Sequence, residues 1–188
     1  MIQFNIPTII TLLRIVLIPF FVVAFYLPAE WARLVAAAIF VLAGVTDWLD
    51  GYLARRWNQT SPFGAFLDPV ADKLMVAAAL VLLVSDMPTF WVAVPSIVII
   101  GREIAISALR EWMAEIGERT NVAVSMVGKV KTAVQMLAIF LLLYREPVAG
   151  IPTSVVGMVL LYIAMLLTLW SMLIYLRSAL PVLSTTRN

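Results

Sequence analysis

Two segments, DWLDGYLAR at 47–55 and GAFLDPVAD at 64–72, are separated by eight residues and together carry the most informative pattern of the sequence. They place four aspartates, Asp47, Asp50, Asp68 and Asp72, in or against segments that are otherwise apolar enough to cross a membrane. A carboxylate near lipid is costly. A group of four therefore requires something cationic beside it.

On helices, the four aspartates occupy two faces. Asp47 and Asp50 are three residues apart, and Gly64, Asp68 and Asp72 follow one another at intervals of four, so each set lies on one side of its helix. Two helices meeting through these faces would form a cup of carboxylate oxygens. Such a ligand set suits Mg²⁺ or Mn²⁺ rather than zinc.

The composition indicates an integral membrane protein. The chain has 188 residues, of which 63% are hydrophobic and 13% charged, whereas a soluble domain has about 25% charged residues. The sequence contains neither cysteine nor histidine, which excludes disulfides, thiol chemistry, Ser-His triads and histidine-bound zinc. We expect one domain, residues 1–188.

Six stretches are long enough, or nearly so, to span a bilayer as helices. An even number of spans places both termini on one side. Most of the Lys and Arg residues outside the spans fall in the 53–66 and 109–131 connections and in the C-terminal tail, which the positive-inside rule assigns to the cytosol. We therefore predict an all-α protein of six transmembrane helices, with a polar, metal-containing cavity open to the cytosolic side. The predicted spans are 6–27, 32–53, 66–85, 89–109, 127–145 and 150–177.

Small residues and an arginine accompany the aspartates. Gly51, Ala54 and Gly64 lie on or beside the aspartate faces, where they leave room for a bulky ligand. Arg55 supplies a planar fork of donors that matches phosphate oxygens. Acidic metal ligands, small residues and an arginine together describe a site for a diphosphate and its metal ions.

With these residues in place, the sequence resembles the CDP-alcohol phosphotransferase family, since every position of that family's aspartate signature is filled. The family transfers a substituted phosphoryl group from a CDP-linked donor to an alcohol and releases CMP. Three further stretches, NIPTIITLLR at 5–14, GRE at 101–103 and GKVKT at 128–132, resemble its bacterial members that use CDP-diacylglycerol as donor and sn-glycerol 3-phosphate as acceptor. The product of that reaction is phosphatidylglycerol phosphate.

The resemblance also implies roles for individual residues. The four aspartates would hold the metal as two Mg²⁺ or Mn²⁺ ions, and Asp72 would be the general base on the acceptor hydroxyl in a direct displacement. It further implies a homodimer in the cytoplasmic (inner) membrane of a bacterium, in contact with membrane lipids and not with nucleic acid. The donor-binding residues would be Asn5, Thr8, Asp47, Asp50, Gly51, Ala54, Arg55, Gly64 and Asp68.

The acceptor carries a phosphate, and the stretch 102–131 offers four cations for it. Arg102, Arg110, Lys129 and Lys131 are the candidates, because a basic pocket would select a phosphorylated alcohol over a neutral one. Other interpretations stay open: these cations obey the positive-inside rule or attract anionic lipid, and Arg102 pairs structurally with Glu103.

Two alternative functions remain. One is a related transferase with another acceptor, such as inositol phosphate, serine or phosphatidylglycerol. The other is a cation or proton transporter, because carboxylates inside a membrane also build ion pathways. For Arg14, inside the first span, snorkelling to the interface and a role at the substrate are both open.

Overall fold

The structure is a computed structural model that describes residues 5–57, 62–116 and 126–185. Within these ranges the chain is all-α, as predicted, with no strand. The helices are α1 (Ile6–Tyr26), α2 (Ala32–Arg56), α3 (Pro62–Asp86), α4 (Phe90–Glu115), α5 (Met126–Tyr144) and α6 (Thr153–Thr185).

Four of these helices are long and apolar enough to cross a membrane: α1, α2, α4 and α6, over Ile6–Tyr26, Ala32–Leu53, Phe90–Glu115 and Thr153–Arg177. The structure therefore supports a multi-pass membrane protein. The predicted spans in α3 and α5 remain predictions. α3 begins at Pro62, earlier than the predicted 66, and so brings Gly64 into the same helix as Asp68 and Asp72.

α1 shows how the sequence suits a lipid environment. Ile9, Leu13, Val16, Phe20 and Val23 recur at intervals of three or four, and each is more than half exposed, so they form one apolar face toward lipid. The opposite face carries buried polar side chains near the start of the helix. Water-soluble helices arrange these two faces the other way round.

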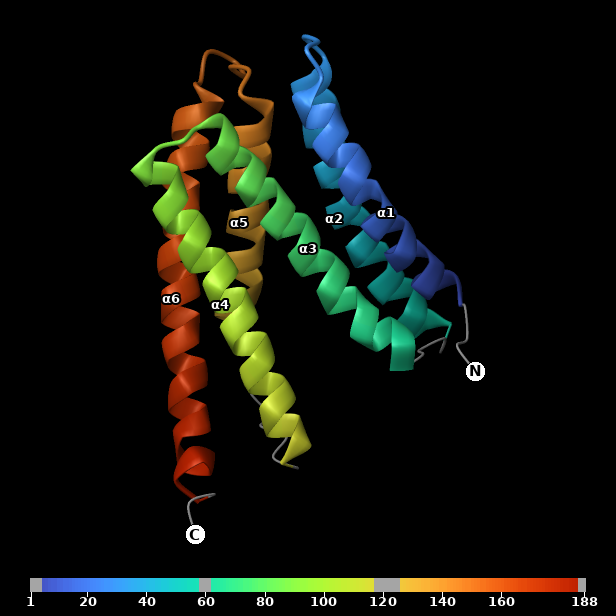
Figure 1. Cartoon of the computed structure of the whole chain (residues 1–188), viewed down its shortest axis with the longest axis vertical. Helices are drawn as coiled ribbons and strands as arrows, with labels where there is room; N and C mark the ends of the chain where they lie inside the picture. Colours follow the sequence, from blue (N-terminus) through green and yellow to red (C-terminus); the bar gives the residue numbers. More distant parts are fainter. Residues whose placement is uncertain (1–4, 58–61, 117–125, 186–188) are drawn as a thin grey trace.

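The helices pack as neighbours in two groups (Figure 1). α1 lies beside α2 and α3, and α6 lies beside α5 and α4. α2 and α3 also touch α5, and α3 touches α4, which joins the groups. The start of α1 and the end of α6 lie at the same end of the molecule in Figure 1, as an even number of helices requires. With 33 residues, α6 is about 50 Å long and exceeds the roughly 30 Å hydrocarbon core of a bilayer.

At the opposite end of the bundle, three charged side chains form what we call the distal clamp: Arg33, Asp86 and Arg145. Arg33 Nη2 lies 3.3 Å from Asp86 Oδ1, and Arg145 Nη2 lies 2.9 Å from Asp86 Oδ2. These residues belong to the start of α2, the end of α3 and the loop after α5. The clamp therefore joins three elements at the end away from the aspartate motif.

Candidate functional site: an acidic centre beside a basic pocket

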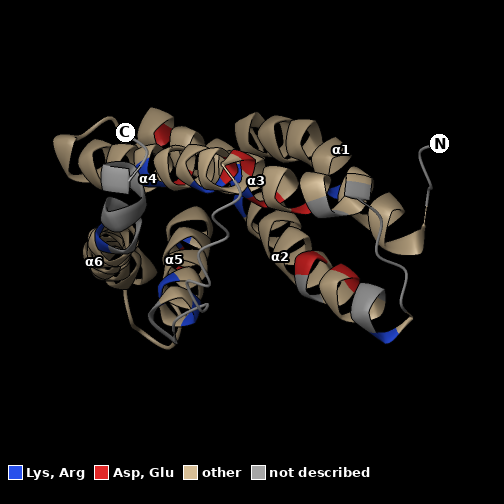
Figure 2. Cartoon of the chain, turned by 90° about the horizontal axis from the view of Figure 1, so that it is seen from below, with Lys and Arg blue, Asp and Glu red and all other residues tan. Residues whose placement is uncertain are grey.

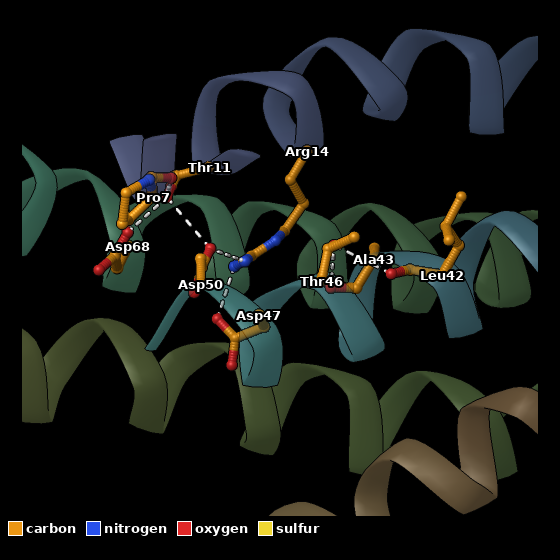
Figure 3. A network of polar contacts seen from close by, with 9 residues as sticks. All are labelled: Pro7, Thr11, Arg14, Leu42, Ala43, Thr46, Asp47, Asp50 and Asp68. Atoms are coloured by element: carbon orange, nitrogen blue, oxygen red, sulfur yellow. Dashed lines mark hydrogen bonds and ion pairs between the residues drawn. The ribbon is translucent and has the colours of Figure 1, made fainter. Parts of the chain in front are cut away.

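Arg14 of α1 organises two of the four aspartates. Its side chain is only 1% exposed, so it does not snorkel to the surface, and that interpretation of the sequence is wrong. Nη1 lies 2.5 Å from Asp47 Oδ1, and Nη2 lies 2.5 Å from Asp50 Oδ2 (Figure 3). One guanidinium thus neutralises part of the charge of two carboxylates, of which Asp50 is 2% exposed and Asp47 45%.

Thr11, one turn before Arg14, lies between α2 and α3. Its Oγ1 is 2.6 Å from Asp68 Oδ1 and 3.2 Å from Asp50 Oδ2, and it is 3.1 Å from the carbonyl oxygen of Pro7 (Figure 3). A hydroxyl has one proton to donate, and the shortest contact makes Asp68 the main acceptor. The two aspartate faces therefore meet through a side chain of α1.

Asp72 lies one turn after Asp68 on α3. It lines a small cavity of about 60 Å³ together with Lys73, Glu103, Lys131 and Gln135. The charges that act on Asp72 are those of Asp47, Glu103, Arg14 and Lys131, which places it between the two groups of helices. We call Asp47, Asp50, Asp68 and Asp72, with Thr11 and Arg14, the acidic centre.

The oxygen ligands of the acidic centre fit Mg²⁺ or Mn²⁺ in kind, because both ions prefer carboxylates. Across the ranges 5–57, 62–116 and 126–185, no three acidic side chains are grouped closely enough to hold a metal ion as they stand. Instead, the cationic position between Asp47 and Asp50 is taken by the Arg14 guanidinium. Metal binding by this set therefore requires Arg14 to move or to share the carboxylates.

A second cavity, of about 240 Å³, lies among α4, α5 and α6. Arg102 donates to Ser171 Oγ at 2.9 Å and lies 3.1 Å from Glu103 Oε1. Arg110 donates to the Tyr175 hydroxyl, and its guanidinium lies 4.8 Å from the centre of that ring. The lining residues, which we call the basic pocket, are Arg102, Glu103, Arg110, Gly128, Lys131, Thr132, Ser171 and Tyr175.

Lys131 connects the basic pocket to Asp72. It lines both cavities, is 7% exposed, and its Nζ lies 2.5 Å from Glu103 Oε1. Three cations and one carboxylate leave the basic pocket with an excess of positive charge. Seen from below in Figure 2, acidic segments mark α2 and α3 and basic segments mark α5 and α6.

The other predicted donor residues are placed as follows. Asn5 is the N-cap residue of α1, Thr8 is buried with an exposure of 2%, and Gly64 is buried in α3. Gly51 lies in α2, one residue after Asp50. The side chains of Ala54 and Arg55 lie outside those that the structure describes.

Of the predicted acceptor residues, the structure brings together Arg102, Arg110 and Lys131 but not Lys129. Lys129 is exposed on α5 and does not line the basic pocket. Residues two apart on a helix do not face the same way, which explains why the two lysines separate.

Sequence reasoning missed Thr11, Ser171 and Tyr175 and left the role of Arg14 open. A signal for α1 was present, since Thr8, Thr11 and Arg14 recur every three residues and so share one helical face inside an apolar segment. For Ser171 and Tyr175, no comparable signal exists. They lie at the end of a long apolar helix and meet Arg102 and Arg110 only through packing.

The fold and site define a class: a helical membrane protein whose carboxylate cluster faces a basic pocket. The chain belongs to the CDP-alcohol phosphatidyltransferase family, whose profile matches residues 4–170. It is 62% identical over 179 residues to the CDP-diacylglycerol–glycerol-3-phosphate 3-phosphatidyltransferase of Pectobacterium atrosepticum, covering 94% of this chain and 96% of the relative. A protein of the same name from Sodalis glossinidius is 61% identical, with 94% of this chain and 96% of the relative covered. Another of the same name, from Haemophilus influenzae, is 59% identical, with 94% of each chain covered.

Proposed function

We propose that this protein transfers the phosphatidyl group of CDP-diacylglycerol to sn-glycerol 3-phosphate, yielding phosphatidylglycerol phosphate and CMP. Family membership and relatives of about 60% identity support the donor and the acceptor. The structural observation that carries the proposal is that Lys131 lines both the cavity of Asp72 and the basic pocket. A nucleophile held in the basic pocket would thus lie beside a carboxylate able to take its proton.

The donor would bind at the acidic centre. Asp47, Asp50, Asp68 and Asp72 would hold two divalent ions, Mg²⁺ or Mn²⁺, which when bound would neutralise the diphosphate and hold the reacting groups in line. Thr8, Gly51 and Gly64 lie within about one turn of Thr11, Asp50 and Asp68 along their own helices, and they would admit the CDP group, with Asn5, Ala54 and Arg55 as further candidates.

The acceptor would bind in the basic pocket through its phosphate. Arg102 and Arg110 offer N–H donors, and Lys131 offers an ammonium group between the pocket and Asp72. Glu103 holds both Arg102 and Lys131, so it fixes these cations rather than binding the phosphate itself. This arrangement favours a phosphorylated alcohol over serine or another zwitterion.

The displacement would proceed in one step. The 1-hydroxyl oxygen of glycerol 3-phosphate forms a bond to the lipid-side phosphorus, and the bond from that phosphorus to the bridging oxygen breaks, so CMP leaves with that oxygen. Asp72 accepts the hydroxyl proton and later releases it to water. Positioning by the basic pocket supplies much of the acceleration that such a reaction requires.

The aspartates lie at the end of α2 and the start of α3, and the residues of the basic pocket lie from the middle of α4 onward, at the start of α5 and in the second half of α6. These parts of the helices lie toward the end of the molecule that holds the start of α1 and the end of α6 (Figure 1). The positive-inside rule assigns this end to the cytosol, where glycerol 3-phosphate is supplied. We accordingly place the site at the cytosolic face of a bacterial inner membrane, with α3 and α5 completing six spans. The proposal also includes a homodimer, which is supported by the family resemblance alone.

The test is CMP release by the purified protein in lipid nanodiscs that contain CDP-diacylglycerol and Mg²⁺ or Mn²⁺. We expect release with glycerol 3-phosphate and little or none with inositol phosphate, serine, phosphatidylglycerol or no alcohol. Release with a different acceptor would reassign the acceptor within the family. No release with any acceptor, together with ion flux in vesicles, would replace the proposal by a transporter.

A further inference from the structure

The small cavity of Asp72 is lined by a buried amide that no described residue pairs with. Gln135 of α5 is 4% exposed, and its side-chain oxygen Oε1 accepts no hydrogen bond from the part of the chain that the structure describes. An unpaired buried amide oxygen is costly, because it has lost its water and gained no partner in exchange. The cavity measures about 60 Å³, whereas one water needs about 10–15 Å³, so it admits a small polar group. These two observations point to a ligand that donates to Gln135.

Gln135 lies beyond the basic pocket on the face of α5 that leads to Asp72. Gly128, Thr132 and Gln135 follow one another at intervals of four and three, so they lie on one side of the helix. Of the two cavities, Gly128 lines the basic pocket, Thr132 lines both, and Gln135 lines the cavity of Asp72. Gln135 is about 4.5 Å beyond Thr132 along the helix axis. A ligand that is held at one end in the basic pocket would therefore meet Gln135 near its other end.

The neighbours of Gln135 in the cavity of Asp72 have contacts of their own. Glu103 Oε1 lies 2.5 Å from Lys131 Nζ, and the Thr132 hydroxyl donates to a backbone carbonyl one turn earlier at 3.1 Å. Gln135 carries no charge, so it adds no attraction for a phosphate or a metal ion. An amide recognises its ligand through hydrogen bonds, and an alcohol hydroxyl, which both donates and accepts, matches it.

We propose that Gln135 binds the 2-hydroxyl of glycerol 3-phosphate and so selects the acceptor by its middle carbon. With the phosphate in the basic pocket and the 1-hydroxyl at Asp72, the 2-hydroxyl is the remaining group of the acceptor that can donate, and it sits on the carbon next to the reacting one. It would donate to Gln135 Oε1. This inference rests on the proposed function and extends it from the phosphate of the acceptor to its carbon chain.

Three contacts with one acceptor also distinguish it from its mirror image. The basic pocket, Asp72 and Gln135 would hold the phosphate, the reacting hydroxyl and the 2-hydroxyl. In sn-glycerol 1-phosphate, the enantiomer, the 2-hydroxyl points to the opposite side when the phosphate and the primary hydroxyl keep their places. Gln135 would then stay unpaired beside a bound ligand, and a site built to bind a hydroxyl strongly rejects an analogue that does not supply it.

The first test uses the unaltered protein in lipid nanodiscs with CDP-diacylglycerol and Mg²⁺ or Mn²⁺. CMP release is measured with glycerol 3-phosphate, with its enantiomer and with 3-hydroxypropyl phosphate, which lacks only the 2-hydroxyl. We expect kcat/KM to be lower by about 10²-fold or more for the second and third compounds. A value for 3-hydroxypropyl phosphate within about threefold of that for glycerol 3-phosphate would overturn the proposal. Absence of CMP release with glycerol 3-phosphate itself would instead remove the proposed function.

The second test compares two variants that each remove a buried, unpaired polar atom. Gln135→Met keeps the length of the side chain, and we expect kcat/KM to fall about 10–100-fold for glycerol 3-phosphate and to stay nearly constant for 3-hydroxypropyl phosphate. The KM of the donor should not change. Thr168→Val changes a fully buried threonine of α6 that lines neither cavity, and it should retain the full preference for glycerol 3-phosphate.

The preference between the two acceptors separates recognition from a structural role. If Gln135→Met lowered kcat/KM equally for glycerol 3-phosphate and 3-hydroxypropyl phosphate, Gln135 would only support the fold and the proposal would be overturned. The first test needs no variant, so it decides the proposal even where Gln135→Met does not fold.

Discussion

The acidic centre on α1, α2 and α3 and the basic pocket on α4, α5 and α6 are built on opposite plans. In the first, the one cation, Arg14, pairs with two of the four aspartates, Asp47 and Asp50. In the second, the one carboxylate, Glu103, pairs with two of the three cations, Arg102 and Lys131. Each region thus contains one residue whose charge is opposite to that of the others. This residue holds two of its neighbours and leaves the excess charge for a ligand. The acidic centre therefore suits cations and the basic pocket suits anions, side by side in one membrane protein.

The largest effect should come from removing a charge where the two regions meet. Asp72→Asn removes the proposed base and one metal ligand, so we expect kcat to fall by about 10³-fold. The measurement is CMP release in nanodiscs at saturating substrates.

Asp86→Asn is the matched control, since it makes the same change in the distal clamp, at the other end of the bundle. It should lower the melting temperature and leave kcat within about twofold. If the two variants lost activity equally, the acidic centre would have no special place in the reaction.

The second-largest effect should come from Arg14, the one cation of the acidic centre. Arg14→Gln leaves Asp47 and Asp50 without their shared partner, one of them almost fully buried, so we expect a loss of about 3–5 kcal/mol in stability. Thermal unfolding in detergent measures it, and Mn²⁺ should restore part of the loss because it can replace the missing positive charge.

Arg33→Gln offers the comparison for this variant. Arg33 is 38% exposed in the distal clamp, and its loss should cost about 1 kcal/mol or less, with no recovery on adding Mn²⁺. Similar melting temperatures for the two variants would show that Arg14 does not organise the aspartates.

The third effect should separate two neighbouring lysines on α5. Lys131→Gln removes a buried cation from the basic pocket, and we expect the KM of glycerol 3-phosphate to rise about 10–100-fold with little change for the donor. Lys129→Gln removes an equal charge from an exposed position and should change neither value by more than about twofold. Initial rates over both substrate concentrations decide this, and a larger effect at Lys129 would contradict the placement of the acceptor.

The smallest effect should come from Tyr175, whose ring lies 5.7 Å from the Arg102 guanidinium carbon and 4.8 Å from that of Arg110. Tyr175→Leu removes this platform, and we expect the acceptor KM to rise about fivefold. Tyr175→Phe keeps the ring and loses only the hydroxyl that accepts from Arg110, so it should restore most of the affinity. An equal loss in both variants would assign the effect to the hydroxyl instead.

The sequence predicted the all-α architecture because hydropathy and length are local properties of each segment. It also predicted that the faces of Asp50 and Asp68 meet, and both lie within 3.2 Å of Thr11 Oγ1. Spacing along a helix could not predict that α1 lies between these faces, because a helical face does not specify its partner. The spacing of Thr8, Thr11 and Arg14 indicates a polar face on α1, but the partners of Thr11 and Arg14 became visible only with the packing of three helices.

The basic pocket shows the same limit. Arg102, Arg110 and Lys131 were candidates because they are cations near one another in the chain, and Lys129 was a candidate for the same reason. Helical geometry separates Lys129 from the pocket, while Ser171 and Tyr175 enter it from more than 60 residues away. Charge is readable from a sequence, but the uncharged residues that hold the charges in place are not.

The most direct test of the central claim, that the two regions serve two different substrates, is one crossed kinetic measurement. It compares Asp47→Asn with Arg110→Gln, with the KM of CDP-diacylglycerol and of glycerol 3-phosphate measured for each variant. We expect a crossed pattern, in which Asp47→Asn changes the KM of the donor and the metal requirement, and Arg110→Gln changes the KM of the acceptor alone. If both variants changed both values in the same proportion, the division of the molecule into a cation-binding and an anion-binding region would be contradicted.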